Sequence, residues 1–182
     1  QKIILPLRQM ATRRRRPVGL SFSGSGHLLV YQLGAACHLL IDNDRWRSRI
    51  THFAGSSGGA IAATLSSLLP RERLATFARD VAIHGHSFTE LSQALAGHGD
   101  YAISETTIAS VSRAQTLFLS ATHCRTGQNA LFSRFSSAVE LQRCVLASAA
   151  IPSAFHPMDL LARANPRYPE ASGIIVSPTC EA

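Results

Sequence analysis

The chain has 182 residues, of which 46% are hydrophobic and 16% are charged. These values are ordinary for one globular domain with a sizeable core, and no apolar run reaches the ~20 residues that a membrane-spanning helix needs. The net charge of +7 comes almost wholly from arginine, because Lys2 is the single lysine. Widely spaced cysteines without a Cys-x-x-Cys pair favour reduced thiols in an intracellular protein over a disulfide framework. They are Cys37, Cys124, Cys144 and Cys180.

Residues 1–16 are predicted to form a basic, disordered leader. The run from Arg13 to Arg16 attracts phosphate, either in nucleic acid or at an anionic membrane surface, and a solvated leader is the third possibility. No aromatic platform or nucleic-acid motif accompanies the run, so we expect no nucleic-acid partner. Pro6 and Arg8 follow the apolar start too soon for a secretory signal, although an arginine-rich start without acids also resembles a transit peptide.

Apolar periodicity predicts strands that alternate with helices along the chain. The expected order is a strand at 18–23, a helix at 27–41, a strand at 49–54, a helix that ends at residue 69 and a helix at 71–83. Residues 84–101 are expected to be irregular, and a helix at 103–114 precedes strands at 116–123 and 130–135, joined by a turn around Gly127. Ser137 and Glu140 form a capping box for a last helix toward Ala150. The alternation predicts an α/β fold.

The stretch Gly55-Ser56-Ser57-Gly58-Gly59 fits Gly-x-Ser-x-Gly between a predicted strand and a predicted helix. This is the sequence form of a nucleophile elbow, a tight turn that excludes side chains two residues before and after its central serine. Ser57 is therefore the candidate nucleophile. The following helix directs its positive end at the site, and the Gly58 N–H is placed to donate to an oxyanion. A helix N-cap serine beside a glycine-rich turn is the simpler alternative.

A second glycine-rich turn, Gly24-Ser25-Gly26, also joins a predicted strand to a predicted helix. The bare backbone amides of such turns bind anions. One use is a dinucleotide pyrophosphate, but a Gly-x-Gly-x-x-Gly fingerprint needs a glycine where Leu29 stands, and no Gly-Lys-Ser/Thr follows to make a P-loop. The other use is an oxyanion hole for Ser57. Two such turns in one chain are far more specific than either alone.

Three stretches of the chain together resemble the patatin-like phospholipase domain family, in the animal-type variant of its lipid hydrolases. They are LSFSGSGHLLVYQLGAACHLL, THFAGSSGGAIAATL and ASAAIPSAFHPM. The resemblance implies a three-layer α/β/α sandwich with a mainly parallel central sheet, and hydrolysis of lipid acyl esters. It also implies a patatin-like domain at 17–168 and a divergent or truncated tail at 169–182, so that the domain would be incomplete at its carboxyl end.

The resemblance also assigns catalytic roles to particular residues. The family's oxyanion motif falls on Gly24, Ser25 and Gly26, although Leu29 replaces a glycine of the family's loop, and its nucleophile falls on Ser57. Its second catalytic residue is an aspartate in an Asp-Gly turn, two residues after a tyrosine. That position is occupied by Glu170, two residues after Tyr168 and followed by Ala171 instead of glycine. The resemblance implies a serine–acid dyad without histidine, metal or organic cofactor.

Other groupings of side chains remain open as alternatives. The chain order serine, aspartate, histidine allows a triad of Ser57, Asp100 and His156, but ordinary α/β-hydrolases build more than two strands before the elbow. Asp159 is another possible base for a dyad. A metal site at the histidines between residues 84 and 98 is a further alternative, yet no cysteine pair accompanies them and a solvated loop is the simpler interpretation. These histidines are His84, His86 and His98.

The expected function is a serine hydrolase that cleaves carboxylic esters of triacylglycerols or phospholipids at a membrane or lipid-droplet surface. A non-catalytic lipid-binding protein of the same fold is the first alternative, because Glu170 matches the acid position poorly. A dinucleotide-binding domain is the second. The expected partner is an acyl lipid, and the expected location is intracellular, in the cytoplasm or peripheral at a membrane or lipid droplet, without secretion.

Overall fold

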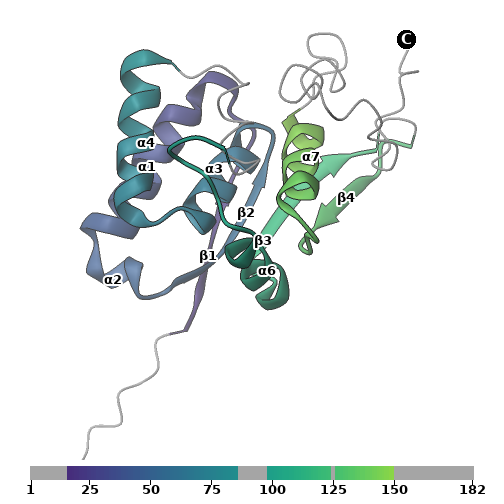
Figure 1. Cartoon of the computed structure of the whole chain (residues 1–182), viewed down its shortest axis with the longest axis horizontal. Helices are drawn as coiled ribbons and strands as arrows, with labels where there is room; N and C mark the ends of the chain where they lie inside the picture. The colour runs from purple at the N-terminus through teal and green to yellow at the C-terminus, as the bar shows by residue number, and fades with distance from the viewer. Residues whose placement is uncertain (1–15, 86–97, 124–125, 150–182) are drawn as a thin grey trace, which may run out of the picture.

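The computed structural model describes residues 16–85, 98–123 and 126–149, and it contains one open, mixed sheet (Figure 1). The strands are β1 (Val18–Phe22), β2 (Ile50–Ser56), β3 (Leu117–Thr122) and β4 (Asn129–Phe132), in the order β1-β2-β3-β4. The first three are parallel, and β4 is antiparallel to β3. The predicted α/β class and the mainly parallel sheet are therefore confirmed. The four expected strands are all present, and β2 extends two residues further than expected, to Ser56.

The helices also follow the predicted order. The first expected helix is composite: a short 3₁₀ turn, an α-helix and a π turn follow one another without a break. The helical elements are η1 (Gly26–Leu28), α1 (Leu29–Cys37), η2 (His38–Asp42), α2 (Asp44–Arg47), α3 (Gly58–Leu68), α4 (Arg71–His84), α6 (Glu105–Ala114) and α7 (Ala138–Ala149). Most of the expected irregular stretch at 84–101 lies outside the described residues, as do residues 1–15 and the proposed tail at 169–182.

The connections from β1 to β2 and from β2 to β3 step across the sheet in the same direction. Parallel crossovers are right-handed, so both helical connections pack on the same face. Phe53, Leu117 and Leu119 point toward that face and are buried. On the opposite face His52 is exposed, and Leu131 keeps 61% of its surface accessible. The connecting helices thus lie on one face of the sheet, and a helical layer on the other face, as an α/β/α sandwich requires, stays a prediction.

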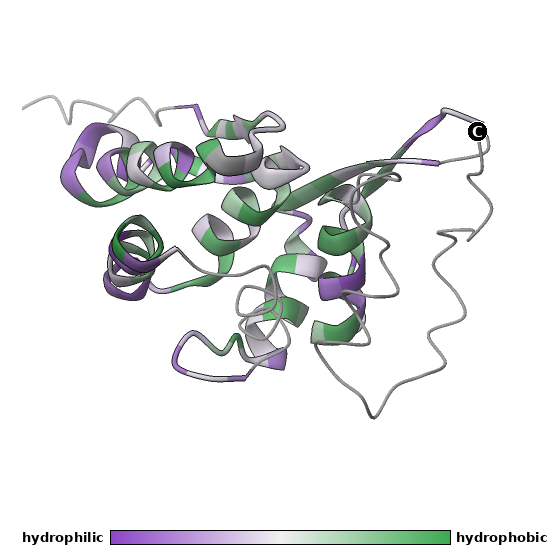
Figure 2. Ribbon diagram, turned by 90° about the horizontal axis from the view of Figure 1, so that it is seen from above, coloured by the Kyte–Doolittle hydropathy of each residue, from purple (hydrophilic) through white to green (hydrophobic). Residues whose placement is uncertain are grey.

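Helix α3 is the centre of the core. Ten of its 11 residues are buried, including Ala60, Ala62 and Ala63, because it lies between the sheet and the helices α1 and α4. A helix that is apolar on all sides is stable only when it is surrounded. Figure 2 shows the hydrophobic residues of strands and helices meeting in the interior, with hydrophilic residues on the outer helical faces. The residue that precedes this helix is consequently held in place on several sides.

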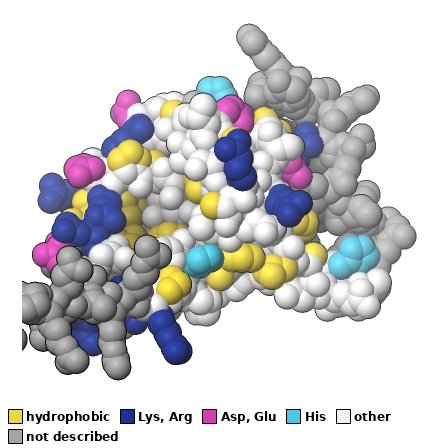
Figure 3. Space-filling view, turned by 90° about the horizontal axis from the view of Figure 1, so that it is seen from below, with side chains coloured by type: hydrophobic (Ala, Val, Ile, Leu, Met, Phe, Trp, Pro, Cys, Tyr) yellow, Lys and Arg dark blue, Asp and Glu magenta, His cyan; other side chains and the backbone are white. Residues whose placement is uncertain are grey.

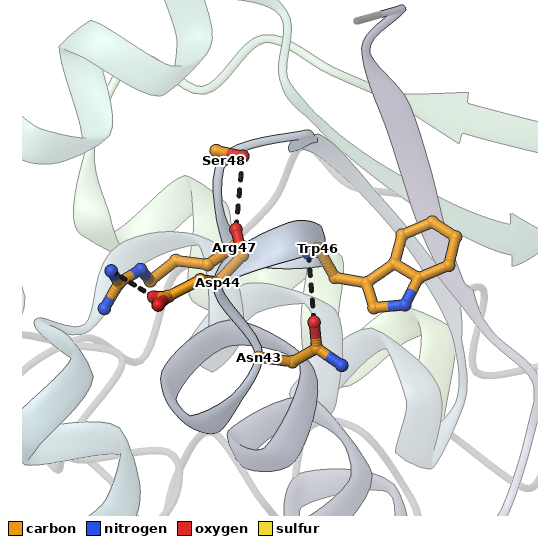
Figure 4. A network of polar contacts seen from close by, with 5 residues as sticks. All are labelled: Asn43, Asp44, Trp46, Arg47 and Ser48. Carbon is orange, nitrogen blue, oxygen red and sulfur yellow. Dashed lines mark hydrogen bonds and ion pairs between the residues drawn. The ribbon is translucent and has the colours of Figure 1, made fainter.

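A short helix that the sequence analysis did not predict follows Asn43. The expected helix ends there, but the Asn43 side chain accepts a hydrogen bond from the Trp46 amide at 3.4 Å and caps α2 (Figure 4). Asp44 forms an ion pair with Arg47, and the Ser48 hydroxyl donates to the Asp44 carbonyl at 3.2 Å. Asparagine is a strong N-cap, so Asn43, which was expected only to end the preceding helix, also begins the next one.

The predicted capping box at the start of α7 is half correct. The Glu140 amide donates to the Ser137 hydroxyl at 3.2 Å, as expected. The Glu140 carboxylate, however, accepts hydrogen bonds from the side chain and the backbone amide of Ser136, one residue earlier than a capping box requires. These bonds to the charged form hold the pKa of Glu140 below its ordinary value. Glu105 of α6 caps the same helix, because its carboxylate accepts from the Ala138 amide at 3.0 Å.

Candidate active site

Ser57 occupies a sharp, strained turn between β2 and α3. Its backbone has φ 54° and ψ −129°, and among the described residues only Gln115 shares a positive φ without being glycine. Such a conformation costs about 1–3 kcal/mol and persists only where the surroundings enforce it. The residue is half-buried, so it is not sealed in the core. This is the geometry that the Gly-x-Ser-x-Gly pattern predicts.

The glycines two residues before and after Ser57 are required by space. A methyl group on Gly55 would lie 2.1 Å from the carbonyl oxygen of Gly59. One on Gly59 would lie 2.4 Å from the carbonyl oxygens of both Phe22 and Ser23. Real carbon–oxygen contacts do not approach so closely, and backbone atoms cannot swing aside. Gly55 and Gly59 therefore let α3 start directly against the ends of β1 and β2.

The two glycine-rich turns come together at the carboxyl ends of β1 and β2. A methyl group on Gly24 would lie 3.5 Å from the Cβ atom of Ser57. One on Gly58 would lie 2.7 Å from the Ser25 hydroxyl oxygen and 3.1 Å from the Gly26 nitrogen. Both approaches join residues more than 30 positions apart in the chain. The structure thus places the turn at 24–26 beside the candidate nucleophile.

Three backbone amides at this junction have no acceptor among the described residues. Among the hydrogen bonds of the described residues, none has the N–H of Ser25, Gly26 or Gly58 as its donor. Gly58 is the first residue of α3, and the partial positive charge of a helix start adds to the attraction. The N–H of Ser57 itself is already used, since it donates to the Ser148 hydroxyl at 2.8 Å.

Gln32 of α1 fastens the turn at 24–26 on both sides of its first glycine. Its side-chain nitrogen donates to the Ser23 carbonyl at 2.9 Å, and its side-chain oxygen accepts from the Ser25 hydroxyl at 3.0 Å. The sequence analysis missed both Gln32 and Ser148. Gln32 could have been found as a polar residue in an otherwise apolar helix. Ser148 could have been found as a serine within the stretch ASAAIPSAFHPM, one of the three that carry the family resemblance.

A proton acceptor for Ser57 is not found in the part of the chain that the structure describes. No carboxylate or imidazole there forms a hydrogen bond with the Ser57 hydroxyl. Glu170, Asp159 and His156 all lie outside the described residues, so the predicted dyad acid and the alternative triad remain predictions. Asp100 is described, and it is exposed in the turn that precedes α6.

Among the described residues, the other reactive groups form no competing site. Burial raises the pKa of the Cys144 thiol to about 12, so this cysteine is not a thiolate at neutral pH. Within the described ranges no three of the side chains His, Cys, Asp and Glu gather as a metal site would require. His84 and His98 fall in these ranges, whereas His86 does not.

A cavity of about 330 Å³ lies on the open face of the sheet, next to the elbow but on the other side of β2 from α3. Ala54 and Ser56 contribute to its wall because side chains alternate along a strand, which directs them away from the face that Gly55 presents to α3. Its other lining residues are Ser21, Phe22, Ser23, Gly55, Phe118, Ser120 and Leu131. Ser57 is not part of this lining.

Basic side chains gather at the opposite end of the molecule, around α2. Arg45 and Arg49 place their guanidinium carbons 5.7 Å and 5.0 Å from the centre of the Trp46 ring, which is the arrangement of a cation–π contact. Arg49 also donates to the Arg16 carbonyl at 3.4 Å. Figure 3 shows several arginine side chains together at the end of the molecule where α2 lies. This corner is at the amino ends of β1 and β2, away from Ser57.

A scan against models of known protein families finds no match for the chain, and a search of curated proteins finds none either. None of the described helices has the length and apolar character needed to span a bilayer.

Proposed function

We propose that the chain is a serine acyl hydrolase with a patatin-like fold. Ser57 attacks the carbonyl carbon of an ester, and the amides of Ser25, Gly26 and Gly58 donate to the oxygen that becomes negative. The alcohol leaves with a proton and the acyl group stays on Ser57 until water cleaves it as a carboxylic acid. The observation that carries this proposal is the approach of the turn at 24–26 to the strained serine.

The base that takes the Ser57 proton is proposed to be Glu170, on the resemblance alone. Glutamate has the right chemistry, since a carboxylate beside a serine accepts its proton during attack. Glu170→Gln should lower the reaction rate, whereas Asp159→Asn should not. The reverse result would move the role to Asp159.

Acyl lipids are the proposed substrates, met at a membrane or lipid-droplet surface. Leu28 and Tyr31, which are 67% and 77% exposed, lie within two turns of helix from Gly26. Exposed apolar side chains beside a catalytic site suit a substrate that is delivered from a lipid surface. The arginine-rich corner around α2 is at the other end of the strands and supports no such role.

A fluorophosphonate probe, which reacts with activated serines, tests the proposal. The wild-type chain should be labelled, and a mass map should place the adduct on Ser57. Ser57→Ala should abolish labelling, while the neighbouring Ser56→Ala, whose side chain faces the other side of the sheet, should keep it. Absence of labelling in folded wild-type protein would contradict the proposal.

A non-catalytic lipid-binding protein is the second candidate. It is favoured by one observation, the absence of a base hydrogen-bonded to Ser57 among the described residues. Unlabelled, folded protein that still takes up a fluorescent fatty acid would support this candidate.

Stabilisation of the fold against heat by NAD would instead favour dinucleotide binding. The buried Leu29 argues against this alternative, because it stands where the dinucleotide fingerprint has its third glycine.

A further inference from the structure

We infer that Ser148 is a positioning residue for Ser57, because its hydroxyl takes the place of a β2–β3 hydrogen bond at the point where the chain turns out of the sheet at Ser57. The inference rests on the proposed function, in which Ser57 is the nucleophile. Ser148 lies in the last turn of α7 and comes from a different part of the chain than either glycine-rich turn. Its hydroxyl accepts from the Ser57 amide at 2.8 Å and donates to the Ser120 carbonyl at 2.6 Å.

The ladder between β2 and β3 shows what this hydroxyl replaces. The Phe53 amide donates to the Thr116 carbonyl at 2.7 Å, and the two parallel strands then keep a constant register up to the pair Ser56 and Ser120. Hydrogen bonds from one strand to its neighbour recur every second residue. Two such steps from Phe53 and Thr116 make the Ser120 carbonyl the expected acceptor for the Ser57 amide. The Ser148 hydroxyl is inserted between these two groups.

The direction of the two bonds is fixed by chemistry. A backbone amide can only donate and a carbonyl can only accept, so a single hydroxyl that accepts on one side and donates on the other satisfies both. Alanine in place of Ser148 would leave two partly buried backbone groups without partners, or would let the ladder close directly. Either outcome is unfavourable for the elbow, because a buried polar group without a partner destabilises the fold and a closed ladder moves Ser57.

The insertion has two consequences for Ser57. It separates the serine from β3, so the backbone can leave the extended conformation and reach φ 54°. It also takes up the Ser57 N–H, so the donors that remain for the oxyanion hole are the amides of Ser25, Gly26 and Gly58. Closure of the ladder in a Ser148 variant would draw Ser57 back toward the strand and turn its hydroxyl away from those amides. Errors of about 1 Å in such a placement can lower a rate by as much as ~100-fold.

The test compares Ser148→Ala with Ser148→Thr, which keeps a hydroxyl, and with Ser112→Ala as a matched control. Ser112 is also a helical serine whose hydroxyl accepts a distant backbone N–H, that of Phe135 at 2.8 Å, away from the elbow. Two quantities are measured: the exchange rate of the Ser57 amide proton by NMR, and the maximal rate of labelling by the fluorophosphonate together with its half-saturating concentration.

S148A is expected to accelerate Ser57 amide exchange and to lower the maximal labelling rate about 10- to 100-fold, with an unchanged half-saturating concentration. S148T and S112A should keep both values near wild type. Labelling by S148A at the wild-type maximal rate would overturn the role of Ser148 and leave the proposed function intact. Absence of labelling in wild-type protein would overturn the proposed function and the catalytic use of Ser148 with it. Should S148A not fold, S148C, whose thiol is a weak hydrogen-bonding group, is expected to show the same changes in smaller measure.

Discussion

The two glycine-rich turns, after β1 and after β2, use glycine for different reasons. After β2, Gly55 and Gly59 are needed because backbone oxygen atoms lie 2.1–2.4 Å from where their side chains would begin, while the strained residue is a serine. After β1, no atom crowds Gly26, but its backbone has φ 48°. The turn after β2 is enforced by packing. The turn after β1 depends on the conformational freedom of glycine and is held by hydrogen bonds to Gln32. Substitutions of glycine should therefore lower the free energy of unfolding far more in the turn after β2 than in the turn after β1.

Gly59→Ala should have the largest effect on stability. Its methyl group would lie 2.4 Å from two carbonyl oxygens at the end of β1, so either α3 or β1 must move. We expect a loss of more than about 4 kcal/mol in the free energy of unfolding, or no folded protein at all. Urea denaturation measures it. A loss below about 1 kcal/mol would show that the two elements are not packed as described.

Gly26→Ala should cost about 1–2 kcal/mol, because an alanine in the left-handed region is strained even in open space. Gly26→Asn is the matched variant, since asparagine tolerates this conformation and should restore much of the stability. The same urea titration compares the two. Equal losses for both variants would point to a steric cause and contradict the distinction between the turns.

Gln32→Glu should act on labelling more than on folding. The carboxylate can still accept from the Ser25 hydroxyl, but it cannot donate to the Ser23 carbonyl, so the turn at 24–26 loses one of its two fasteners. We expect labelling by the fluorophosphonate to slow by up to about tenfold, since a hydrogen bond of this kind is worth ~1 kcal/mol. An unchanged labelling rate in both Gln32→Glu and Gln32→Ala would remove Gln32 from the account.

Gly34→Ala should give the smallest change and in the opposite direction. Gly34 is exposed in the middle of α1, with no atom near the position of an added methyl group. Replacing glycine by alanine in such a helix position stabilises by about 0.5–1 kcal/mol. Thermal denaturation should show a small rise in melting temperature with labelling unchanged. A fall would indicate that α1 needs flexibility at this point.

The parts of the fold that depend on neighbouring residues were predictable from the sequence. Apolar periodicity located the four strands and the long helices, and the pattern from Gly55 to Gly59 predicted the elbow, because local steric needs select glycine there. Helix α2 was missed, since its four residues, three of them charged, are too few to show an apolar periodicity. The one-residue shift of the Glu140 carboxylate, to Ser136, was also beyond a local pattern.

The contacts that complete the site come from residues far apart in the chain. Ser148 is 91 positions from Ser57, and its role follows from the register of β2 and β3, which no local pattern contains. Gln32 is nine positions from the carbonyl that it binds, across a turn and a change of helix type. Such contacts are set by tertiary packing. The local motif therefore predicts the candidate nucleophile Ser57 but not Gln32 or Ser148, which hold the site in place.

The most direct test of the convergence of the two turns is an NMR comparison of the chain before and after a phosphonate is attached to Ser57. The phosphoryl oxygen would stand where the oxyanion forms and would accept hydrogen bonds from nearby amides. We predict marked downfield shifts of the amide protons of Ser25, Gly26 and Gly58, with none at a distant control amide such as that of Phe135. A phosphonate attached to Ser57 that leaves all three amide protons unshifted would contradict the account.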